Sequence, residues 1–186
     1  MTSRLVIVTG LPASGKTTLA RAIARRYRVA LLAKDTVKEG LLDVLGACDA
    51  AGSRRLSTAS FAALFALARE AIASGADLVM EGNFRPQEHC APLAALLAAA
   101  TGVRCAQLLC RTPEALRRAR LESRRTDPAR HPGHRDAELA RAGILEAPGT
   151  DQFIDIPGER LHVDGASQPS STQALQMLDA WWRSGA

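Results

Sequence analysis

The octapeptide GLPASGKT, from Gly10 to Thr17, constrains this chain more than any other stretch. It fits the pattern G-x-x-x-x-G-K-[ST] and stands between an apolar, β-branched run at residues 4–10 and a segment at 16–27 with a helical apolar period. Glycines allow the backbone to curl so that successive N–H groups point inward, and the following helix directs its positive N-terminal end at the same place. The sequence therefore predicts a strand, a phosphate-binding loop and a helix in direct succession.

Two positions of this loop have a chemical task of their own. Lys16 is long enough to reach the β- and γ-phosphates of a nucleotide, and the hydroxyl of Thr17 can ligate Mg²⁺. An ordinary glycine turn before a helix is the alternative, and the flanking strand and helix argue against it. We therefore predict that ATP and Mg²⁺ bind to Gly10, Leu11, Pro12, Ala13, Ser14, Gly15, Lys16, Thr17 and Thr18.

The rest of the chain alternates between apolar runs of strand length and segments with a helical period. Further strands are expected at residues 29–35, 76–82, 103–110 and 160–165. Further helices are expected at residues 36–45, 57–74, 86–102, from 113 onward, 137–145 and 172–182, with residues 46–55 as a polar connection. This alternation predicts a three-layer α/β protein with a five-stranded, mainly parallel sheet. Together with the phosphate-binding loop it predicts the P-loop NTPase fold. We expect one domain over residues 1–186.

Length and composition limit the class of protein. The hydrophobic fraction is 47%, and no apolar run approaches the ~20 residues needed to cross a bilayer. The first apolar run is too short for a signal peptide, so we expect a cytoplasmic protein. The four cysteines form no CxxC pair and are expected to be reduced, mostly buried thiols.

Positive charge is concentrated in one stretch. Residues 111–135 hold eight arginines against three acidic residues, an excess that equals the net charge of the whole chain, +5. Within it, RRTDPARHPGHR at 124–135 could meet nucleic acid, a bound nucleotide or solvent. His131 and His134 could suggest a metal pair, but no third ligand is evident nearby, so surface histidines are expected.

Missing motifs narrow the kind of phosphate-loop protein. Asn83 is the only asparagine and is followed by Phe84, so the N-K-x-D motif with which GTPases read guanine is absent. No Asp-Glu pair ends a predicted strand, and the chain lacks the length of a motor, transporter or AAA+ ATPase. A small kinase remains.

Four sequence elements resemble the small P-loop kinases of the AAA_33 or zeta-toxin-like type, which are related to nucleoside monophosphate kinases, polynucleotide 5′-hydroxyl kinases and chloramphenicol phosphotransferase. The elements are GLPASGKTTLA, LLAKD after the second predicted strand, VMEGNF after the third, and an R-L-x-x-R helix from Arg120 to Arg124. The resemblance covers most of the chain, and its first element is the most specific.

The resemblance implies that Asp35 is the general base, and the expected position of Asp35 beyond the carboxyl end of a strand agrees with this. Asp35 could instead cap a helix beginning at Thr36. Glu81 is implied to support Mg²⁺, with a surface or capping glutamate as the alternative. Asn83, Phe84 and Arg85 are candidates for acceptor binding together with Asp35 and Glu81. For Lys34 and Lys38, although near this site, we expect a solvated helix face.

The arginine-rich stretch is implied to be a lid over approximately residues 113–145. Arg120 and Arg124 are four residues apart, share a helix face and are expected to act on the triphosphate. Other arginines could also reach the phosphates, namely Arg117, Arg118, Arg125 and Arg130.

The sequence thus favours a phosphotransferase that moves the γ-phosphate of ATP to a hydroxyl of a small-molecule acceptor. A regulatory or toxin-like ATP-binding module with a protein partner remains an alternative. So does a nucleic-acid 5′-hydroxyl kinase, which is less favoured because only four Phe, two Trp and one Tyr are available for base stacking. The acceptor and the oligomeric state stay open.

Overall fold

The computed structural model describes residues 3–46, 49–99, 101–124, 126–128, 130–131, 133, 151–166 and 168–184, without the side chains of 168–171. Three predictions lie outside the described residues, namely the helix at 137–145, Arg125 and His134. Most of the predicted lid beyond Arg124 lies outside them as well.

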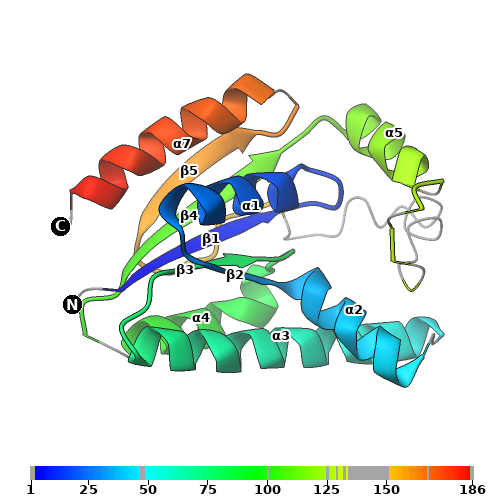
Figure 1. The fold of residues 1–186 in the computed structure, drawn as a ribbon, viewed down its shortest axis with the longest axis horizontal. Coiled ribbons are helices and arrows are strands. Elements are labelled where there is room, and N and C mark those ends of the chain that lie inside the picture. Colours follow the sequence, from blue (N-terminus) through cyan, green and yellow to red (C-terminus); the bar gives the residue numbers. More distant parts are fainter. Residues whose placement is uncertain are drawn as a thin grey trace.

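Five strands form a single sheet in the order β2-β3-β1-β4-β5, and every strand pairing is parallel (Figure 1). The strands are β1 (Arg4–Gly10), β2 (Ala30–Ala33), β3 (Leu78–Glu81), β4 (Arg104–Arg111) and β5 (Glu159–Asp164). All carboxyl ends therefore meet at one edge of the sheet, where open α/β sheets bind ligands. The predicted α/β fold with a five-stranded parallel sheet is confirmed.

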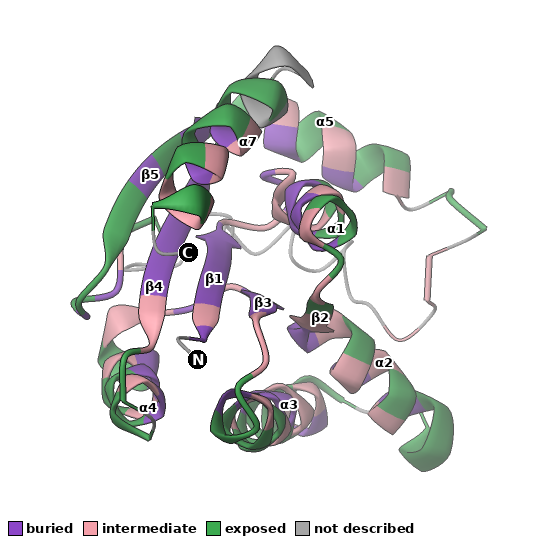
Figure 2. Ribbon diagram, turned by 60° about the vertical axis from the view of Figure 1, so that its left-hand side comes forward, coloured by how far each residue is buried: buried purple, intermediate pink, exposed green. Residues whose placement is uncertain are grey.

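Helices cover both faces of this sheet (Figure 1). Side chains of β1 alternate between two cores. Leu5 and Ile7 face a cluster with α3 and α4, while Val6 and Val8 face a cluster with α1 and α7. Figure 2 shows that β1 and much of β4 are buried, whereas the outer sides of the helices are exposed. The helices are α1 (Lys16–Tyr27), α2 (Lys34–Leu45), α3 (Ala50–Ala73), α4 (Pro86–Ala98), α5 (Glu114–Arg124) and α7 (Gln168–Arg183).

Two helices begin earlier than predicted. α2 begins at Lys34 because β2 ends at Ala33, so Asp35 lies inside the first turn and is not the N-cap residue. A carboxylate in a first helical turn is favoured by the helix dipole. α3 begins at Ala50 because Asp49 Oδ1 accepts a hydrogen bond of 2.7 Å from the backbone N–H of Gly52. Much of the predicted connection at residues 46–55 is therefore helical.

α3 is also more apolar than expected. Among the described helices it is the one whose length and composition would allow it to cross a membrane. In the fold its buried residues Phe61, Leu64, Ala68 and Ile72 pack beneath the sheet, as a core helix does.

The described cysteines are free thiols. Cys105 and Cys110 are buried in β4, and burial raises the pKa of each thiol to about 12. Cys90 is half-buried, and its Sγ lies 3.2 Å from the carbonyl oxygen of Asp155. These contacts agree with the prediction of reduced structural thiols.

Candidate active site

The phosphate-binding loop adopts a backbone that its glycines make possible. Gly10 has φ +144°, and a Cβ placed there would lie 2.4 Å from the carbonyl oxygen of Cys110 in β4. Gly15, the N-cap residue of α1, has φ +89°, and Ala13 has φ +62°. Such left-handed values curl the chain tightly between β1 and α1. The loop therefore has the predicted position and shape.

The loop also carries polar groups suited to phosphate. Lys16 Nζ folds back and donates to the carbonyl oxygen of Leu11 at 3.2 Å. Ser14 Oγ is buried and has no hydrogen-bond partner among the described residues. α1 begins at Lys16 with no side-chain cap, so its N-terminal end faces the loop as an anion-binding site. A triphosphate fits this set of donors.

Thr17 and Glu81 join the loop to β3. The Thr17 hydroxyl donates to Glu81 Oε1 at 3.3 Å, and Glu81 is only 2% exposed. Burial raises the pKa of Glu81, while the nearby charge of Lys16 opposes that shift. Glu81 is thus neither a surface nor a capping residue. Hydroxyl and carboxylate oxygens are ligands that Mg²⁺ accepts, so this pair fits the metal.

Asp35 lies at the same edge, in the first turn of α2. Its side chain is 44% exposed and receives a contact of 3.1 Å from Lys34 Nζ. The Asp35 charge also contributes to the raised pKa of Glu81, so the two carboxyl groups belong to one site. An accessible carboxylate beside the phosphate loop can accept a proton from a hydroxyl group.

The prediction of a solvated face for Lys34 and Lys38 was wrong. Lys34 is 6% exposed and Lys38 is 9% exposed, because this face of α2 packs toward α3 and the end of β3. Lys38 Nζ lies 2.8 Å from Ser53 Oγ in α3. Both ammonium groups therefore lie in the interior, and that of Lys34 is beside Asp35.

The segment after β3 holds the predicted acceptor residues. Asn83 is half-buried, and Phe84 is fully buried with its backbone N–H donating to Thr9 Oγ1 at 3.2 Å. The guanidinium of Arg85 pairs with Glu88 of α4 at 2.7 Å. The hydrogen bond from Phe84 therefore ties this segment to the end of β1. The prediction that Phe84 contacts the acceptor was wrong, because its ring is fully buried in the core with Phe61.

The arginines of α5 divide between two directions. Arg120 donates to the carbonyl oxygen of Ala13 at 3.2 Å and to that of Gly165 at 2.9 Å. Arg124 lines the same cavity as Arg120. By contrast, Arg117 is buried and donates to the Thr112 carbonyl, and Arg118 pairs with Glu114 on the exposed side. The structure thus brings Arg120 and Arg124 to the phosphate loop.

The described residues beyond α5 reach α2. His131 Nε2 lies 3.0 Å from Asp43 Oδ1. A Cβ on Gly133 would lie 2.6 Å from Leu42 Cδ1, so this segment packs closely on the same helix. Among the described residues no group of three His, Cys, Asp or Glu side chains could hold a metal ion. His131 therefore bridges the segment to α2.

Two residues that the sequence analysis did not single out complete the loop. Thr112 Oγ1 donates to the Ser14 carbonyl at 3.0 Å. Gly165 approaches so closely that a Cβ there would lie 2.0 Å from the Ser14 carbonyl oxygen. Both residues directly follow a strand, at the carboxyl edge of the sheet where ligands bind. This position in the sequence could have identified them as candidates for the site.

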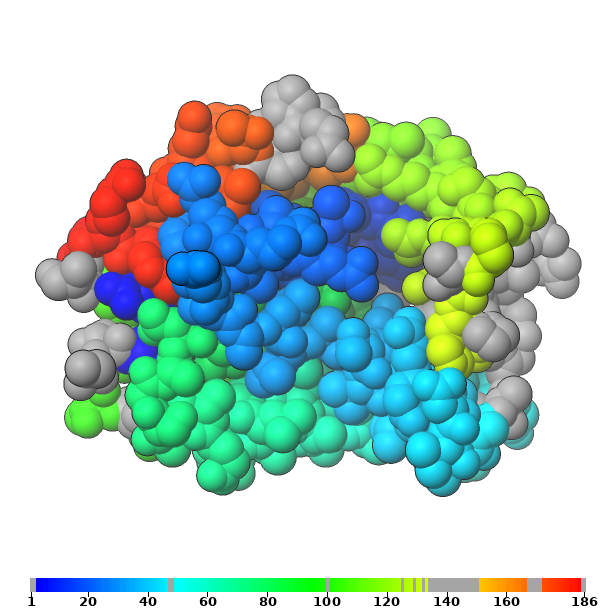
Figure 3. All heavy atoms as spheres, viewed as in Figure 1, coloured from blue at the N-terminus to red at the C-terminus, as the bar shows by residue number. Residues whose placement is uncertain are grey.

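A cavity of about 250 Å³ lies beside the loop, lined by Ser14, Gly15, Thr18, Arg120, Arg124 and Gly165 among others. In Figure 3 the dark blue residues at the start of the loop are recessed between the light blue α2 and the yellow-green α5. A second cavity of about 490 Å³ adjoins Leu11 at the ends of β4 and β5.

Comparison with known proteins agrees with this geometry. A family model described as an AAA domain, AAA_33, matches residues 5–142. The chain belongs to this family. Among curated proteins none is significantly similar to it.

Solved structures similar to this AAA_33 chain include several kinases. A provisionally assigned kinase from Chloroflexus aurantiacus is 33% identical, with a TM-score of 0.83 over 97% of this chain and 98% of that one. A gluconokinase from Sinorhizobium meliloti is 16% identical, with a TM-score of 0.53 over 98% and 97%. The APS kinase CysC of Mycobacterium tuberculosis, in complex with AMPPNP and APS, is 22% identical, with a TM-score of 0.56 over 96% and 98%. The last two share the fold with this chain, which is that of P-loop kinases.

Proposed function

We propose that this protein transfers the γ-phosphate of ATP to a hydroxyl group of a small-molecule acceptor. The observation that carries the proposal is the convergence of Lys16, the Thr17–Glu81 pair and Asp35 at one edge of the sheet. Together they provide a phosphate site, a set of Mg²⁺ ligands and an accessible carboxylate. Phosphoryl transfer needs these parts and little covalent chemistry from the protein.

The nucleotide phosphates would bind to Gly10–Thr18, where backbone N–H groups and Lys16 donate to them. Thr17 and Glu81 would hold Mg²⁺, directly or through its water ligands. The ion would neutralise part of the negative charge of the triphosphate. Arg120 and Arg124 approach the same loop from α5. Their positive charge would stabilise the transferring phosphoryl group.

Asp35 would accept the proton of the acceptor hydroxyl. As the new bond forms between the acceptor oxygen and the γ-phosphorus, the bond to the β,γ-bridging oxygen breaks and ADP leaves. The acceptor would bind between Asp35 and the segment after β3, with Asn83 and Arg85 as contact candidates. The gluconokinase and APS kinase with the same fold are named as enzymes acting on small molecules, which supports a small acceptor.

The test is a transfer assay with labelled ATP and Mg²⁺ on pools of nucleosides, sugars, antibiotics and oligonucleotides. We expect label in a small-molecule pool, and we expect Asp35→Asn to lower the transfer rate by about 10²- to 10⁴-fold with ATP affinity retained. Asp155→Asn is the control, because the Asp155 carboxylate is exposed and forms a surface ion pair with Arg160. Acceptor-independent ATP hydrolysis that Asp35→Asn leaves intact would contradict the proposal.

A further inference from the structure

Lys34 makes a contact that its position in the chain does not favour. Neighbouring residues on a helix point about 100° apart and do not ordinarily face each other. Yet Lys34 Nζ lies 3.1 Å from Asp35 Oδ1. The ammonium must therefore turn back across the first turn of α2 to reach the adjacent carboxylate.

Packing accounts for this turn. The Lys34 side chain is 8% exposed, whereas that of Asp35 is 44% exposed. A Cβ on Gly82 would lie 3.3 Å from Lys34 Cβ and 3.2 Å from the ring of Phe61. Gly82 thus allows the start of α2 to approach β3 closely, and this approach confines the stem of Lys34. A confined stem fixes the direction of the ammonium group.

The contact between Lys34 and Asp35 lies among several other charged groups. Glu81, Lys16 and Lys34 lie close enough together that each lysine lowers the pKa of Glu81 while Asp35 raises it. Asp35 therefore has a second carboxyl group nearby, and like charges repel each other. The Lys34 ammonium contacts Asp35 directly, so its attraction opposes that repulsion and holds the carboxylate in place.

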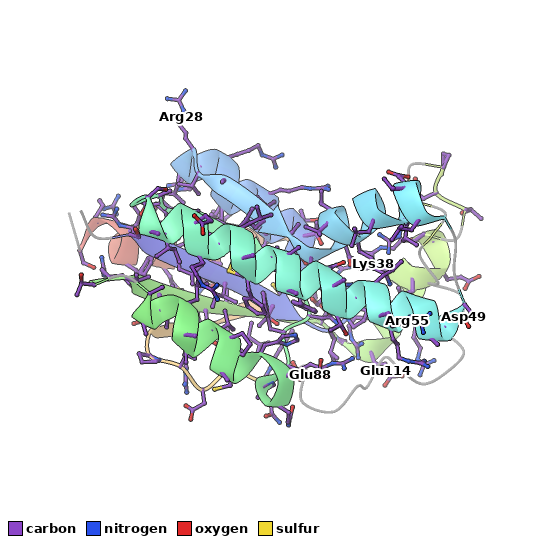
Figure 4. The ribbon with its side chains drawn as sticks, turned by 90° about the horizontal axis from the view of Figure 1, so that it is seen from below. Arg28, Lys38, Asp49, Arg55, Glu88 and Glu114 are labelled. Carbon is purple, nitrogen blue, oxygen red and sulfur yellow. The ribbon has the colours of Figure 1, made fainter. Side chains whose placement is uncertain are left out.

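We infer that Lys34 is a positioning residue that orients the Asp35 carboxylate toward the acceptor hydroxyl. This inference rests on the proposed function of Asp35. Lys34 itself need not touch substrate, because its buried ammonium acts through the adjacent carboxylate. Lys38 is its structural counterpart one turn further along α2, and its Nζ contacts Ser53 Oγ of α3. Figure 4 labels Lys38 where α2 runs beside α3.

A double-mutant cycle tests the inference, because a residue that acts only through Asp35 has no effect once Asp35 is removed. Turnover is measured as ADP formed from labelled Mg·ATP with the acceptor found in the screen, or with water where the screen finds none. We expect Lys34→Met to lower kcat by about 10- to 100-fold in the native background and by less than about threefold in Asp35→Asn. The KM for ATP should stay within about twofold in both backgrounds.

Lys38→Met is the matched control, since it also removes a nearly buried ammonium from this helix face. Thermal unfolding compares the structural cost of the two variants. The effect of Lys38→Met on kcat should be the same in both backgrounds.

Equal losses from Lys34→Met in both backgrounds would overturn the inference while leaving the proposed function intact. An unimpaired Asp35→Asn variant would instead remove the proposed base, and with it this role of Lys34. If Lys34→Met does not fold, Lys34→Gln carries the same comparison.

Discussion

The hydroxyl of Thr17 donates to Glu81 Oε1 across 3.3 Å and so joins the first turn of α1 to the end of β3. These residues are 64 positions apart in the chain, and the parallel pairing of β1 with β3 brings them together. The contact connects the phosphate loop to the strand that ends beside α2.

Glu81→Gln should weaken the use of Mg²⁺. The amide keeps the size of the side chain but loses the negative charge that would attract Mg²⁺ beside the Thr17 hydroxyl. We expect kcat to fall by about 10- to 100-fold and the Mg²⁺ concentration for half-maximal rate to rise. The measurement is a Mg²⁺ titration of transfer at saturating ATP. Glu70→Gln, on the exposed side of α3, is the control, and an unchanged titration in Glu81→Gln would be evidence against this role.

Arg120→Ala and Arg124→Ala should each slow phosphoryl transfer by about 10²- to 10³-fold, because they remove positive charge at the phosphate loop. Arg118→Ala should change the rate by less than about threefold, since Arg118 pairs with Glu114 on the exposed side of α5. Oligonucleotide binding is measured in parallel by fluorescence anisotropy. If Arg120→Ala or Arg124→Ala weakened that binding as much as transfer, a nucleic-acid role for the arginine-rich stretch would return to favour.

Gly165→Ala should lower ATP affinity by about tenfold or more, because the added methyl would lie 2.0 Å from the Ser14 carbonyl oxygen and displace the loop. The same displacement should weaken the bond from Arg120 to Gly165. Calorimetry with Mg·AMP-PNP gives the affinity. Gly40→Ala is the control, because no atom lies within 4 Å of a Cβ there. In α2 it should stabilise the fold by about 1 kcal/mol. Normal affinity in Gly165→Ala would mean that the loop tolerates the shift.

Asp179→Asn should reduce stability in a pH-dependent way. Hydrogen bonds from Arg26 and from the Tyr27 hydroxyl, the latter 2.6 Å long, lower the pKa of Asp179 to about 2. The carboxylate therefore stabilises the packing of α7 on α1 fully above the ordinary aspartate pKa of about 3.9, and this stabilisation is lost as pH falls toward 2.

Chemical unfolding should show a loss of about 1 kcal/mol in Asp179→Asn at pH 7, and the difference from the native protein should shrink between pH 4 and pH 2. Asp155→Asn, which alters an exposed carboxylate, should show no such trend. A constant difference across this pH range would assign the loss to packing and not to charge.

The phosphate loop could be predicted because its determinants are local. Gly10, Gly15, Lys16 and Thr17 lie within eight residues, and the strand and helix that flank them follow from apolar spacing alone. The parallel sheet was predictable for a similar reason, since helices alternate with buried strands. Helix starts were less predictable. Ala33 precedes α2 without a side-chain cap, and the hydrogen bond from Gly52 to the Asp49 side chain that begins α3 is not encoded in apolar periodicity.

The burial of Lys34 and Lys38 was not predictable from charge. A lysine on a helix is usually solvated, and only the packing of α2 on α3 and against Gly82, the residue after β3, turned this face inward. The role of Gly165 was not predictable either. A glycine is needed there because the backbone of Ser14, 151 residues earlier in the chain, leaves no room for a Cβ atom.

By itself, the sequence determined that this protein has a phosphate-binding loop between a strand and a helix, and that apolar strands alternate with helices. The tertiary structure alone decided which side chains meet that loop. Sheet order placed Glu81 beside Thr17, and the approach of α5 placed Arg120 on Ala13 and Gly165. The physical reason is that local patterns encode backbone conformation, whereas contacts between distant residues depend on strand order and on the close packing of whole elements.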